Sequence, residues 1–265
     1  MAPWLATKYP CAVYNYDCAF LNTTTPAPGS LAFLDEHVLV TLNFVHCSAL
    51  VMLPEAQRFK QLLGFNLKHV TLIDWSRAAA ITPDCFPYMV FLCLAYVNLT
   101  KIPDGMLGPL PPLLQDIEFT HTNLSVIPDD LYEHWPSVGM LYFEFSGIQQ
   151  VPDTLTQMPL FDFSLIGNQI HNVSILAAMP TIGVYVSVDL NPITTLPMAF
   201  DQAEVALVVL SAEHTQLADA SEQLLSKIRA LYAAGTPLCA SEAALDTTVV
   251  CDSDYARASG KCFLF

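Results

Sequence analysis

Apolar residues return along this chain at one fixed set of intervals, and this repeat limits the available folds more than any other feature. Each copy has the spacing L-x-x-L-x-L-x-x-N-x-L-x-x-I-P, in which x is any residue and N is a slot for asparagine or a substitute. The clearest copy consists of Met89, Leu92, Leu94, Val97, Leu99, Ile102 and Pro103. Eight copies can be read between Leu39 and Leu217.

The copies differ in how well they keep the spacing. The second is read as Leu67, Val70, Leu72, Trp75, Ala78 and Ile81. The last is read as Leu207, Val209, Ala212, His214 and Leu217. Only Asn168 and Asn191 fill the asparagine slot itself, so we expect a structure less regular than the leucine spacing alone implies.

Each L-x-L core alternates apolar residues with others, which is the pattern of a short β-strand with one buried face. An asparagine in the turn slot can hydrogen-bond backbone groups of neighbouring turns. One copy cannot bury its apolar row alone, so neighbouring copies must stack into a parallel sheet around one core. Proline after the last apolar slot disfavours a long helix on the other side of that core.

The spacing, with a period of roughly 20–29 residues, resembles the leucine-rich-repeat superfamily. This resemblance implies an α/β solenoid. It would be a horseshoe with a parallel β-sheet on the concave face, short 3₁₀ or irregular chain on the convex side, and caps at both ends. The segments W-L-A-T-K-Y-P-C-A-V-Y-N-Y-D-C, H-C-S-A-L-V-M-L-P and F-S-L-I-G-N-Q-I look more narrowly like oomycete cell-surface leucine-rich-repeat proteins. That group presents its repeats outside the cell, often beside a membrane-spanning segment, so membrane-anchored relatives are expected.

The repeat divides the chain into one domain with three parts. Residues 1–38 are expected to form an N-terminal cap, residues 39–217 about eight repeats, and residues 218–265 a C-terminal cap with a cysteine-containing tail. Between Ser221 and Ala234 the apolar residues have helical spacing. Ser221 is a suitable N-cap and Gly235 a suitable stop, so a helix is predicted to cover the open end of the solenoid.

Composition restricts the partners. The net charge is −15 with only 10 Lys plus Arg, which disfavours nucleic acid and anionic lipid and favours a protein or peptide with basic or apolar side chains; a glycan stays possible. No apolar run reaches the roughly 18 residues that a membrane span needs. The N-terminus shows no signal peptide. An extracellular or cell-surface location is expected from the resemblance, with the cytoplasm as the alternative.

Eight cysteines lie near the two ends and in the early repeats. Disulfides often close the open ends of extracellular solenoids, so we expect Cys11 to pair with Cys18, and Cys239 to pair with Cys251 or Cys262. Cys47 occupies an inward turn slot and is interpreted as a buried thiol. The pairing of Cys85 and Cys93 stays open. No C-x-x-C pair is present, so no metal site is predicted.

Four N-glycosylation sequons also favour the secretory pathway. They begin at Asn22, Asn98, Asn123 and Asn172. Asn98 and Asn123 occupy the same outward slot in consecutive repeats. Their side chains should therefore leave one edge of the sheet about 5 Å apart, where two glycans could crowd each other. In a cytosolic protein the four tripeptides would be chance matches.

The outward positions of the middle strands predict a mixed aromatic and acidic patch on the concave face. Aromatic side chains give contact area at low entropic cost, and carboxylates select for charge. Concave solenoid surfaces are the usual binding sites, although such faces carry some of these residues in any case. The candidate ligand-binding residues are Tyr96, Asp116, Glu118, His121, Tyr142, Glu144, Phe145, Asp162 and Tyr185.

Catalysis is not expected. Glu118 and Glu144 on adjacent repeats, with His121 near, could imitate the carboxylate pair of a glycoside hydrolase. Carboxylates on an open surface usually stay solvated, and no nucleophile elbow, phosphate-binding loop or cofactor motif is present. We therefore expect a non-enzymatic extracellular recognition module without a cofactor. A cytosolic scaffold for protein–protein interaction is the first alternative, and the hydrolase-like pair is a weaker one.

Overall fold

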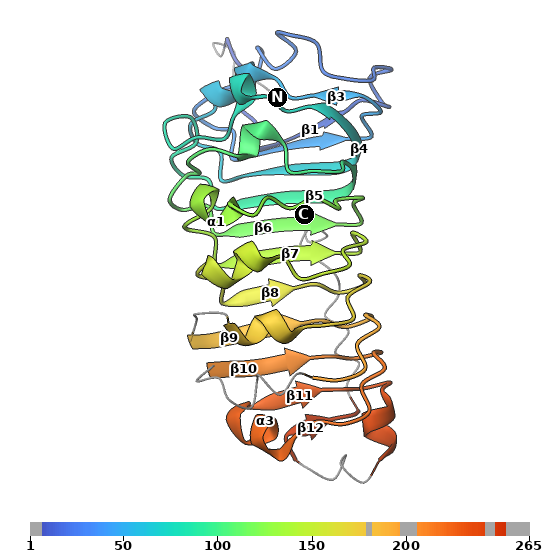
Figure 1. Ribbon diagram of the computed structural model, residues 1–265. Coiled ribbons are helices and arrows are strands. Elements are labelled where there is room, and N and C mark those ends of the chain that lie inside the picture. The colour runs from blue at the N-terminus through green and yellow to red at the C-terminus, as the bar shows by residue number, and fades with distance from the viewer. Residues whose placement is uncertain (1–6, 179–181, 197–205, 242–246, 253–265) are drawn as a thin grey trace.

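A single parallel β-sheet runs the whole length of the molecule (Figure 1). The computed structural model describes residues 7–178, 182–196, 206–241 and 247–252, and within these the sheet has twelve strands. Neighbours in the sequence are neighbours in the sheet, except that β3 pairs only with β4 beside the main path. The strands are β1 (Val13–Asp17), β2 (Thr41–Val45), β3 (Leu50–Val51), β4 (Gly64–Asp74), β5 (Phe91–Asn98), β6 (Asp116–Thr120), β7 (Met140–Glu144), β8 (Asp162–Ser164), β9 (Ile182–Ser187), β10 (Ala206–Ser211), β11 (Ala230–Tyr232) and β12 (Val249–Val250).

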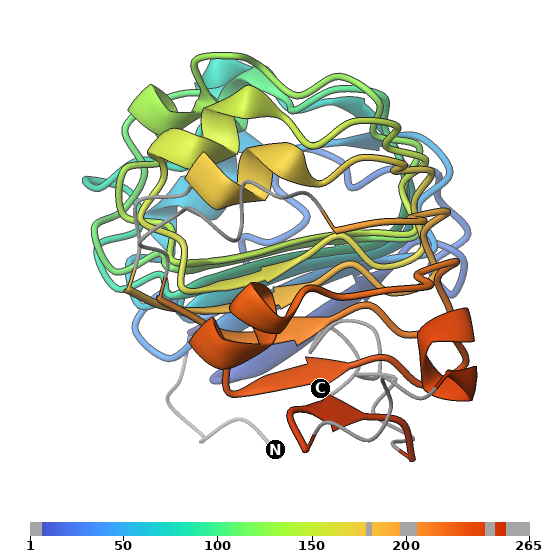
Figure 2. The same ribbon diagram turned by 60° about the horizontal axis from the view of Figure 1, so that its bottom comes forward.

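Short helices connect the strands, and most of them lie across the core from the sheet (Figure 2). Most are 3₁₀ turns, as the prolines predict. Pro54 lies in the first turn of η1, and Pro103 and Pro152 directly precede η3 and η4. None in the described ranges is long and apolar enough to cross a bilayer. The helices are η1 (Pro54–Arg58), η2 (Arg77–Ala79), η3 (Asp104–Met106), α1 (Leu131–His134), η4 (Asp153–Gln157), η5 (Ser174–Ala178), α3 (Glu222–Lys227) and η6 (Pro237–Ala240).

The apolar slots of the repeat form the core between sheet and helices. In the clearest copy, Met89, Leu92 and Leu94 have no exposed surface, and Ile102 has 1%. Trp135 is also fully buried, and its indole N–H donates to the carbonyl of Met106 at 2.8 Å. Burial of these rows in a shared core confirms the predicted solenoid with a parallel sheet on its concave side.

The two asparagine slots hold neighbouring turns together. The Asn168 amide donates to the carbonyls of Phe143 and Leu165, and its oxygen accepts from the N–H groups of Ser146 and Ile148. Asn191 repeats this one turn later, accepting from the N–H of Ile170. These bonds satisfy backbone groups that the turn would otherwise leave buried without partners.

The register of two copies differs from the sequence prediction. In the second copy, Phe65 and Leu67 pair with Leu92 and Leu94 of β5, so Val70 occupies the asparagine slot. The prediction was five residues too late because β4 is long and Leu67, Val70 and Leu72 imitate the spacing of a strand core.

In the last copy the core residues are Leu210 and Ala212, both fully buried, while Val209 is half-buried and His214 exposed. Thr215 fills the asparagine slot, where its hydroxyl donates to the carbonyl of Ala212. The prediction had Leu210 facing outward, and that was wrong.

Both ends of the chain contribute strands to the same sheet. β1 lies within the predicted N-terminal cap and pairs with β2. Ser221 caps α3 by accepting from the N–H of Leu224, as predicted, but α3 ends at Lys227. Leu231 and Ala233 are buried with a spacing of two, which suits a strand, so β11 replaces the second half of the predicted helix.

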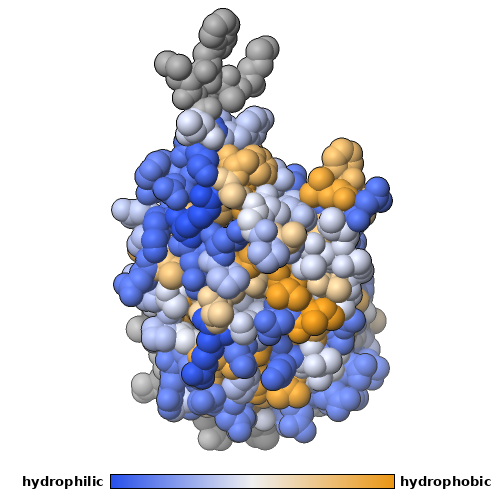
Figure 3. Space-filling view, turned by 90° about the horizontal axis from the view of Figure 1, so that it is seen from above, coloured by the Kyte–Doolittle hydropathy of each residue, from blue (hydrophilic) through white to orange (hydrophobic). Residues whose placement is uncertain are grey.

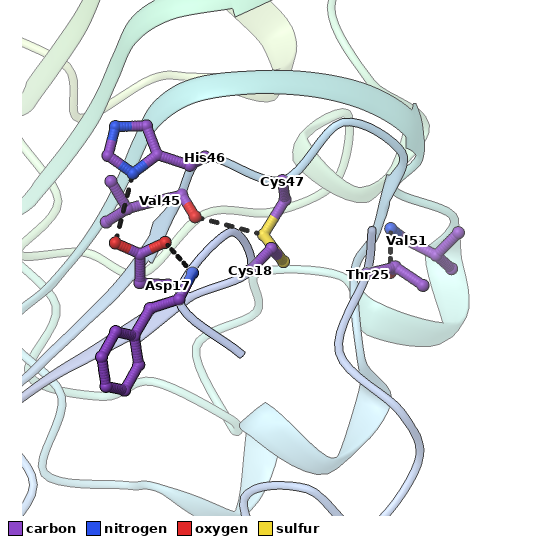
Figure 4. The surroundings of a disulfide bond; sticks show 8 residues. Asp17, Cys18, Thr25, Val45, His46, Cys47 and Val51 are labelled. Carbon is purple, nitrogen blue, oxygen red and sulfur yellow. Dashed lines mark hydrogen bonds and ion pairs between the residues drawn. A yellow bond between two sulfur atoms is a disulfide. The ribbon is translucent and has the colours of Figure 1, made fainter. Parts of the chain in front are cut away.

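Disulfides close the two ends in the described structure, and one pairing differs from the prediction. Cys18 is bonded to Cys47 (Figure 4), so Cys47 is not a free thiol, and Cys11 is free. Cys11 and Cys18 lie on either side of β1 and are therefore about 20 Å apart, too far for a disulfide. Cys239 is bonded to Cys251, one of the two predicted alternatives.

The N-terminal end of the solenoid carries several separate apolar patches among hydrophilic ones (Figure 3). Exposed side chains of the cap include Phe20, Leu21 and Phe33. Scattered apolar groups of this kind are normal on a protein surface.

Candidate functional site: the concave face

The concave face consists of side chains that the strands point away from the core. Because strand neighbours are in register, these side chains form rows that run across the sheet. The middle row contains Asn15, Asn43, Asn66, Cys93, Glu118, Tyr142, Ser164, Ser187 and Ser211. The row two residues later contains Asp17, Val45, Lys68, Ala95, Thr120, Glu144, Ile166, Asp189 and Glu213. The row two residues earlier includes Phe91, Asp116, Met140, Asp162 and Tyr185.

Six of the nine predicted ligand-binding residues lie on this face. Two of them, Asp116 and Tyr185, are partly or well exposed, with Tyr185 at 39%. The other four are buried, although their outward slots predicted that they would be open to solvent. The exposed fractions are 4% for Glu118, 4% for Tyr142, 2% for Glu144 and 8% for Asp162.

At its N-terminal end the middle row is a ladder of asparagines. The Asn66 amide donates to the Asn43 side-chain oxygen at 2.7 Å, and Asn43 donates to Asn15 at 2.5 Å. The sequence prediction missed this ladder because the misread register of the second copy placed Thr71 where Asn66 lies.

The C-terminal half of the face is acidic. Carboxylates lie on each of the rungs β6, β7 and β8, and Asp189 and Glu213 follow β9 and β10. Two serines of the middle row donate to a carboxylate of the preceding rung. Ser164 donates to Glu144 at 2.6 Å, and Ser211 donates to Asp189 at 2.7 Å. In the described strands, Lys68 is the only lysine or arginine in these three rows.

The carboxyl group of Asp189 on this face has a raised pKa. Desolvation by burial raises its pKa to about 6. Hydrogen bonds from Ser211 and from the backbone N–H of Glu213 lower the pKa and so oppose part of this rise. One of its carboxylate oxygens has no hydrogen-bond partner among the residues that the structure describes. Because folding raises this pKa, Asp189 keeps its proton in the native state between about pH 4 and pH 6. In the unfolded state it has already lost that proton in the same range.

Asp189→Asn should therefore change how stability depends on pH. In the parent protein, the contribution of Asp189 to the free energy of unfolding falls by about 2–3 kcal/mol as pH rises from about 4 to 7. The variant keeps an acceptor for Ser211 and loses this dependence. Urea unfolding of both proteins at pH 4, 5.5 and 7 measures the difference. Parallel stability curves would show that Asp189 titrates normally.

A ladder of stacked rings borders the acidic face at the ends of the strands. The other three predicted residues, Tyr96, His121 and Phe145, lie here, one residue beyond the second outward row. The Tyr96 and His121 ring centroids are 4.5 Å apart, as are those of His121 and Phe145. His69 stacks on Tyr96 at 4.7 Å, and His46 on His69 at 5.5 Å.

The backbone turn after each strand produces this stacking. All five ring residues have positive φ, between 48° and 55°, in the left-handed region that turns the next residue inward. The ladder ends at Gly167, whose φ is +69°; a Cβ there would lie 2.3 Å from the Phe145 ring. The sequence shows these residues in one slot of successive repeats, but it does not show the left-handed backbone that stacks them.

Two histidines of the ladder, His69 and His121, have lowered pKa values, which favours their uncharged forms. Desolvation lowers the pKa of His121, and desolvation with the nearby charges of His46 and Lys68 lowers that of His69. Asp17 contacts His46 at 3.2 Å (Figure 4). The backbone N–H of Phe20 and this histidine lower the Asp17 pKa.

The arrangement offers little for catalysis. Glu118 and Glu144 belong to different rows, and the His121 ring lies in the stack beside the face. Two hollows of the described structure lie away from these residues; one is lined by residues that include Trp75 and Lys101, the other by residues that include Asp129 and Pro152. No group of three or more acidic, histidine or cysteine residues in the described ranges could hold a metal ion.

The four sequon asparagines are exposed. The Asn123 side-chain oxygen accepts from the N–H of Leu99 at 2.7 Å, next to Asn98 at the end of β5. The two asparagines therefore lie on neighbouring rungs at the same edge, as their shared slot predicts.

Three solved structures resemble this architecture. TLR13 in complex with ssRNA13 matches with a TM-score of 0.64 and 16% identity, over 84% of this chain and 31% of TLR13. The leucine-rich-repeat protein LIC12759 of Leptospira interrogans matches with a TM-score of 0.53 and 15% identity, over 85% of this chain and 68% of that one. The chain has the leucine-rich-repeat fold.

InlP of Listeria monocytogenes gives a further match, with a TM-score of 0.58 and 12% identity, over 84% of this leucine-rich-repeat chain and 62% of InlP. The chain thus spans less than two thirds of two of these three proteins. No protein-family model matches it, and no curated protein sequence does. At these identities the likeness concerns the fold alone.

Proposed function

We propose that this protein is an extracellular recognition module without catalytic activity, which binds a basic and partly apolar segment of a partner protein or peptide through its concave face. The observation that carries the proposal is the run of carboxylates over neighbouring rungs, where Lys68 is the only basic residue of the described rows. Charge complementarity of this kind selects partners and speeds their association.

The aromatic groups of the face support the apolar part of this specificity. Tyr142 lies between the carboxylate-bearing rungs β6 and β8, and Tyr185 is exposed beside Asp162 in the preceding row. Large rigid side chains of this type often dominate binding energy. RNA, which is present in the TLR13 structure, does not suit the net charge of −15.

An extracellular location is supported by the covalent structure. Disulfides such as Cys18–Cys47 and Cys239–Cys251 persist in oxidising compartments and are rare in the cytosol. The exposed sequons at Asn22, Asn98, Asn123 and Asn172 are compatible with glycosylation on the same route.

A defined peptide tests the proposal. A fluorescent peptide of alternating lysine and phenylalanine is expected to bind the full chain, and Glu144→Gln should weaken it about fivefold, corresponding to about 1 kcal/mol. Glutamine retains the acceptor for Ser164, so the fold is preserved. Glu222→Gln, at an exposed position of α3, makes the same charge change away from the face and serves as control.

Fluorescence anisotropy at 50 and 300 mM salt measures both affinities. If the peptide binds through the acidic face, the higher salt concentration must lower the peptide affinity of the parent more than that of Glu144→Gln. Equal losses for the Glu144 and Glu222 variants, or an affinity that does not depend on salt, would exclude the concave face as the site.

A further inference from the structure

The N-terminal edge of the sheet is a strand without the usual protection. β1 lies at that end of the sheet (Figure 1) and pairs only with β2 in the described structure. Natural proteins usually protect such an edge with a lysine, a proline, a bulge or a very short strand. β1 has five residues, V-Y-N-Y-D, in unbroken register with β2. At the other end of the described sheet, β12 has only two residues.

The backbone of β1 has hydrogen-bonding groups on its outer side. The carbonyl of Ala12 and the N–H of Cys18 bond to the side of β2. Alternate residues of a strand direct their N–H and C=O groups to opposite sides, so those of Val13, Asn15 and Asp17 face away from β2. The side chains of Val13 and Asn15 are exposed, that of Val13 at 54%. The outer side of β1 is therefore open to another strand.

The asparagine ladder of the middle row ends at the same edge. Asn66 donates to Asn43, and Asn43 donates to Asn15. The Asn15 carboxamide thus accepts a bond on its oxygen and keeps two N–H donors, for which the described structure holds no partner. The next group that this ladder can use is an acceptor beside the outer side of β1.

We propose that β1 pairs antiparallel with β1 of a second copy of this chain, around a two-fold axis at Asn15. Asn15 is the middle residue of β1, so this register pairs all five residues and sets Val13 opposite Asp17 of the second copy. The two Asn15 carboxamides meet at the axis, where each donates to the second lone pair of the other's oxygen. A closed pair of this kind buries the same strand of both copies.

This register uses the outward backbone groups of the edge. Val13, Asn15 and Asp17 all occupy hydrogen-bonded pairs of the antiparallel ladder. The carbonyls of Val13 and Asp17 each accept one bond from their own chain and keep a second lone pair for the partner strand. The two-fold axis is perpendicular to the sheet, so the two molecules share one continuous sheet with both concave faces on the same side.

The charge distribution favours a meeting of two copies at this end. The chain has a net charge of −15, but residues 7–34 hold only Lys8 and Asp17, whose charges cancel. Lys8 precedes β1 and Asp17 is its last residue, so antiparallel pairing sets the cationic end of each strand against the anionic end of the other. A register centred on Asp17 would instead bring two carboxylates together. The pairing does not depend on the proposed function, because no ligand takes part in it.

Analytical ultracentrifugation of the full chain tests the dimer. Production in a bacterial periplasm lets disulfides form without N-glycans, so that no glycan at Asn22, close to the end of β1, interferes. As the concentration rises from about 1 to 100 μM, the mass of the parent should approach twice the 29.1 kDa of one chain. A parent that stays monomeric over this range overturns the proposal.

Asn15→Asp tests the contact at the axis. The variant keeps an oxygen that accepts from Asn43, but it brings two carboxylates together where the strands cross the axis. Repulsion between them should weaken dimerisation about tenfold or more. Asn172→Asp is the matched control, because Asn172 is exposed, lies beyond β8, and as aspartate still accepts from the N–H of Ser174. The control should dimerise as the parent does; equal dimerisation of both variants would exclude Asn15 as the centre of the interface.

Asn15→Cys tests the register. Residues opposite each other in a hydrogen-bonded antiparallel pair have Cα atoms about 5.5 Å apart, within the range of a disulfide. Oxidation by glutathione disulfide, which takes up two electrons and two protons from the two new thiols, should give a dimer on a non-reducing gel that a reductant separates. Asn172→Cys and the parent, whose free Cys11 lies away from the axis, should run as monomers. Failure of Asn15→Cys to cross-link, or equal cross-linking of Asn172→Cys, contradicts the proposed pairing.

Discussion

Replacing Asn168 with alanine should lower the free energy of unfolding by about 3–5 kcal/mol. The Asn168 side chain is 5% exposed and makes four good hydrogen bonds to the backbones of its own and the preceding turn. Alanine leaves the N–H groups of Ser146 and Ile148 and the carbonyl of Phe143 buried without this partner, at about 1–3 kcal/mol each. The Leu165 carbonyl keeps a second donor, the Asn191 amide, so it adds little.

Urea unfolding of three variants measures this effect against two references. Gln169→Ala changes the exposed neighbour and should cost less than about 0.5 kcal/mol. Thr122→Ala removes a half-buried hydroxyl that bonds Ser146 at 2.7 Å and should cost about 1 kcal/mol. If Asn168→Ala costs no more than Thr122→Ala, the asparagine does not organise the turn.

The same asparagines show why the sequence predicts the architecture well. The repeat spacing and the turn slot are local patterns, and both have one physical outcome: a strand, a tight turn and a row of buried residues. Apolar slots from Met89 to Val173 were therefore assigned correctly. Register failed in the second copy because β4 is long, and Leu67, Val70 and Leu72 within it imitate the spacing of a strand core.

The candidate site was predictable only in part. The rows of outward residues follow from the spacing, so Glu118, Tyr142 and Glu144 were placed on the concave face. Their burial was not predicted, because an outward slot in a repeat predicts an exposed side chain. The ring ladder depends on left-handed φ values at His121 and Phe145, which those residue types rarely adopt and which the surrounding turns impose.

Removal of the Cys18–Cys47 disulfide should destabilise the protein by about 3–4 kcal/mol. The bond closes a loop with a sequence separation of 29, and cross-linking such a loop lowers the entropy of the unfolded chain by this amount. It also joins the first two rungs of the sheet, because Cys18 follows β1 and Cys47 follows β2. The first rung has a neighbour on one side only, so this link replaces contacts that an inner rung would have.

Unfolding of Cys18→Ala/Cys47→Ala measures this loss, and Cys11→Ala, which removes a free thiol, should leave stability within about 0.5 kcal/mol of the parent. Cys239→Ala/Cys251→Ala should cost slightly less, about 3 kcal/mol, since that loop has a separation of only 12. Thiol titration of the denatured parent adds a further check: Cys11 and Cys85 should react before reduction, and Cys18, Cys47, Cys239 and Cys251 only after it. Reaction of all eight before reduction would exclude the disulfides, and with them the argument for an oxidising compartment, leaving the cytosolic scaffold as the better account.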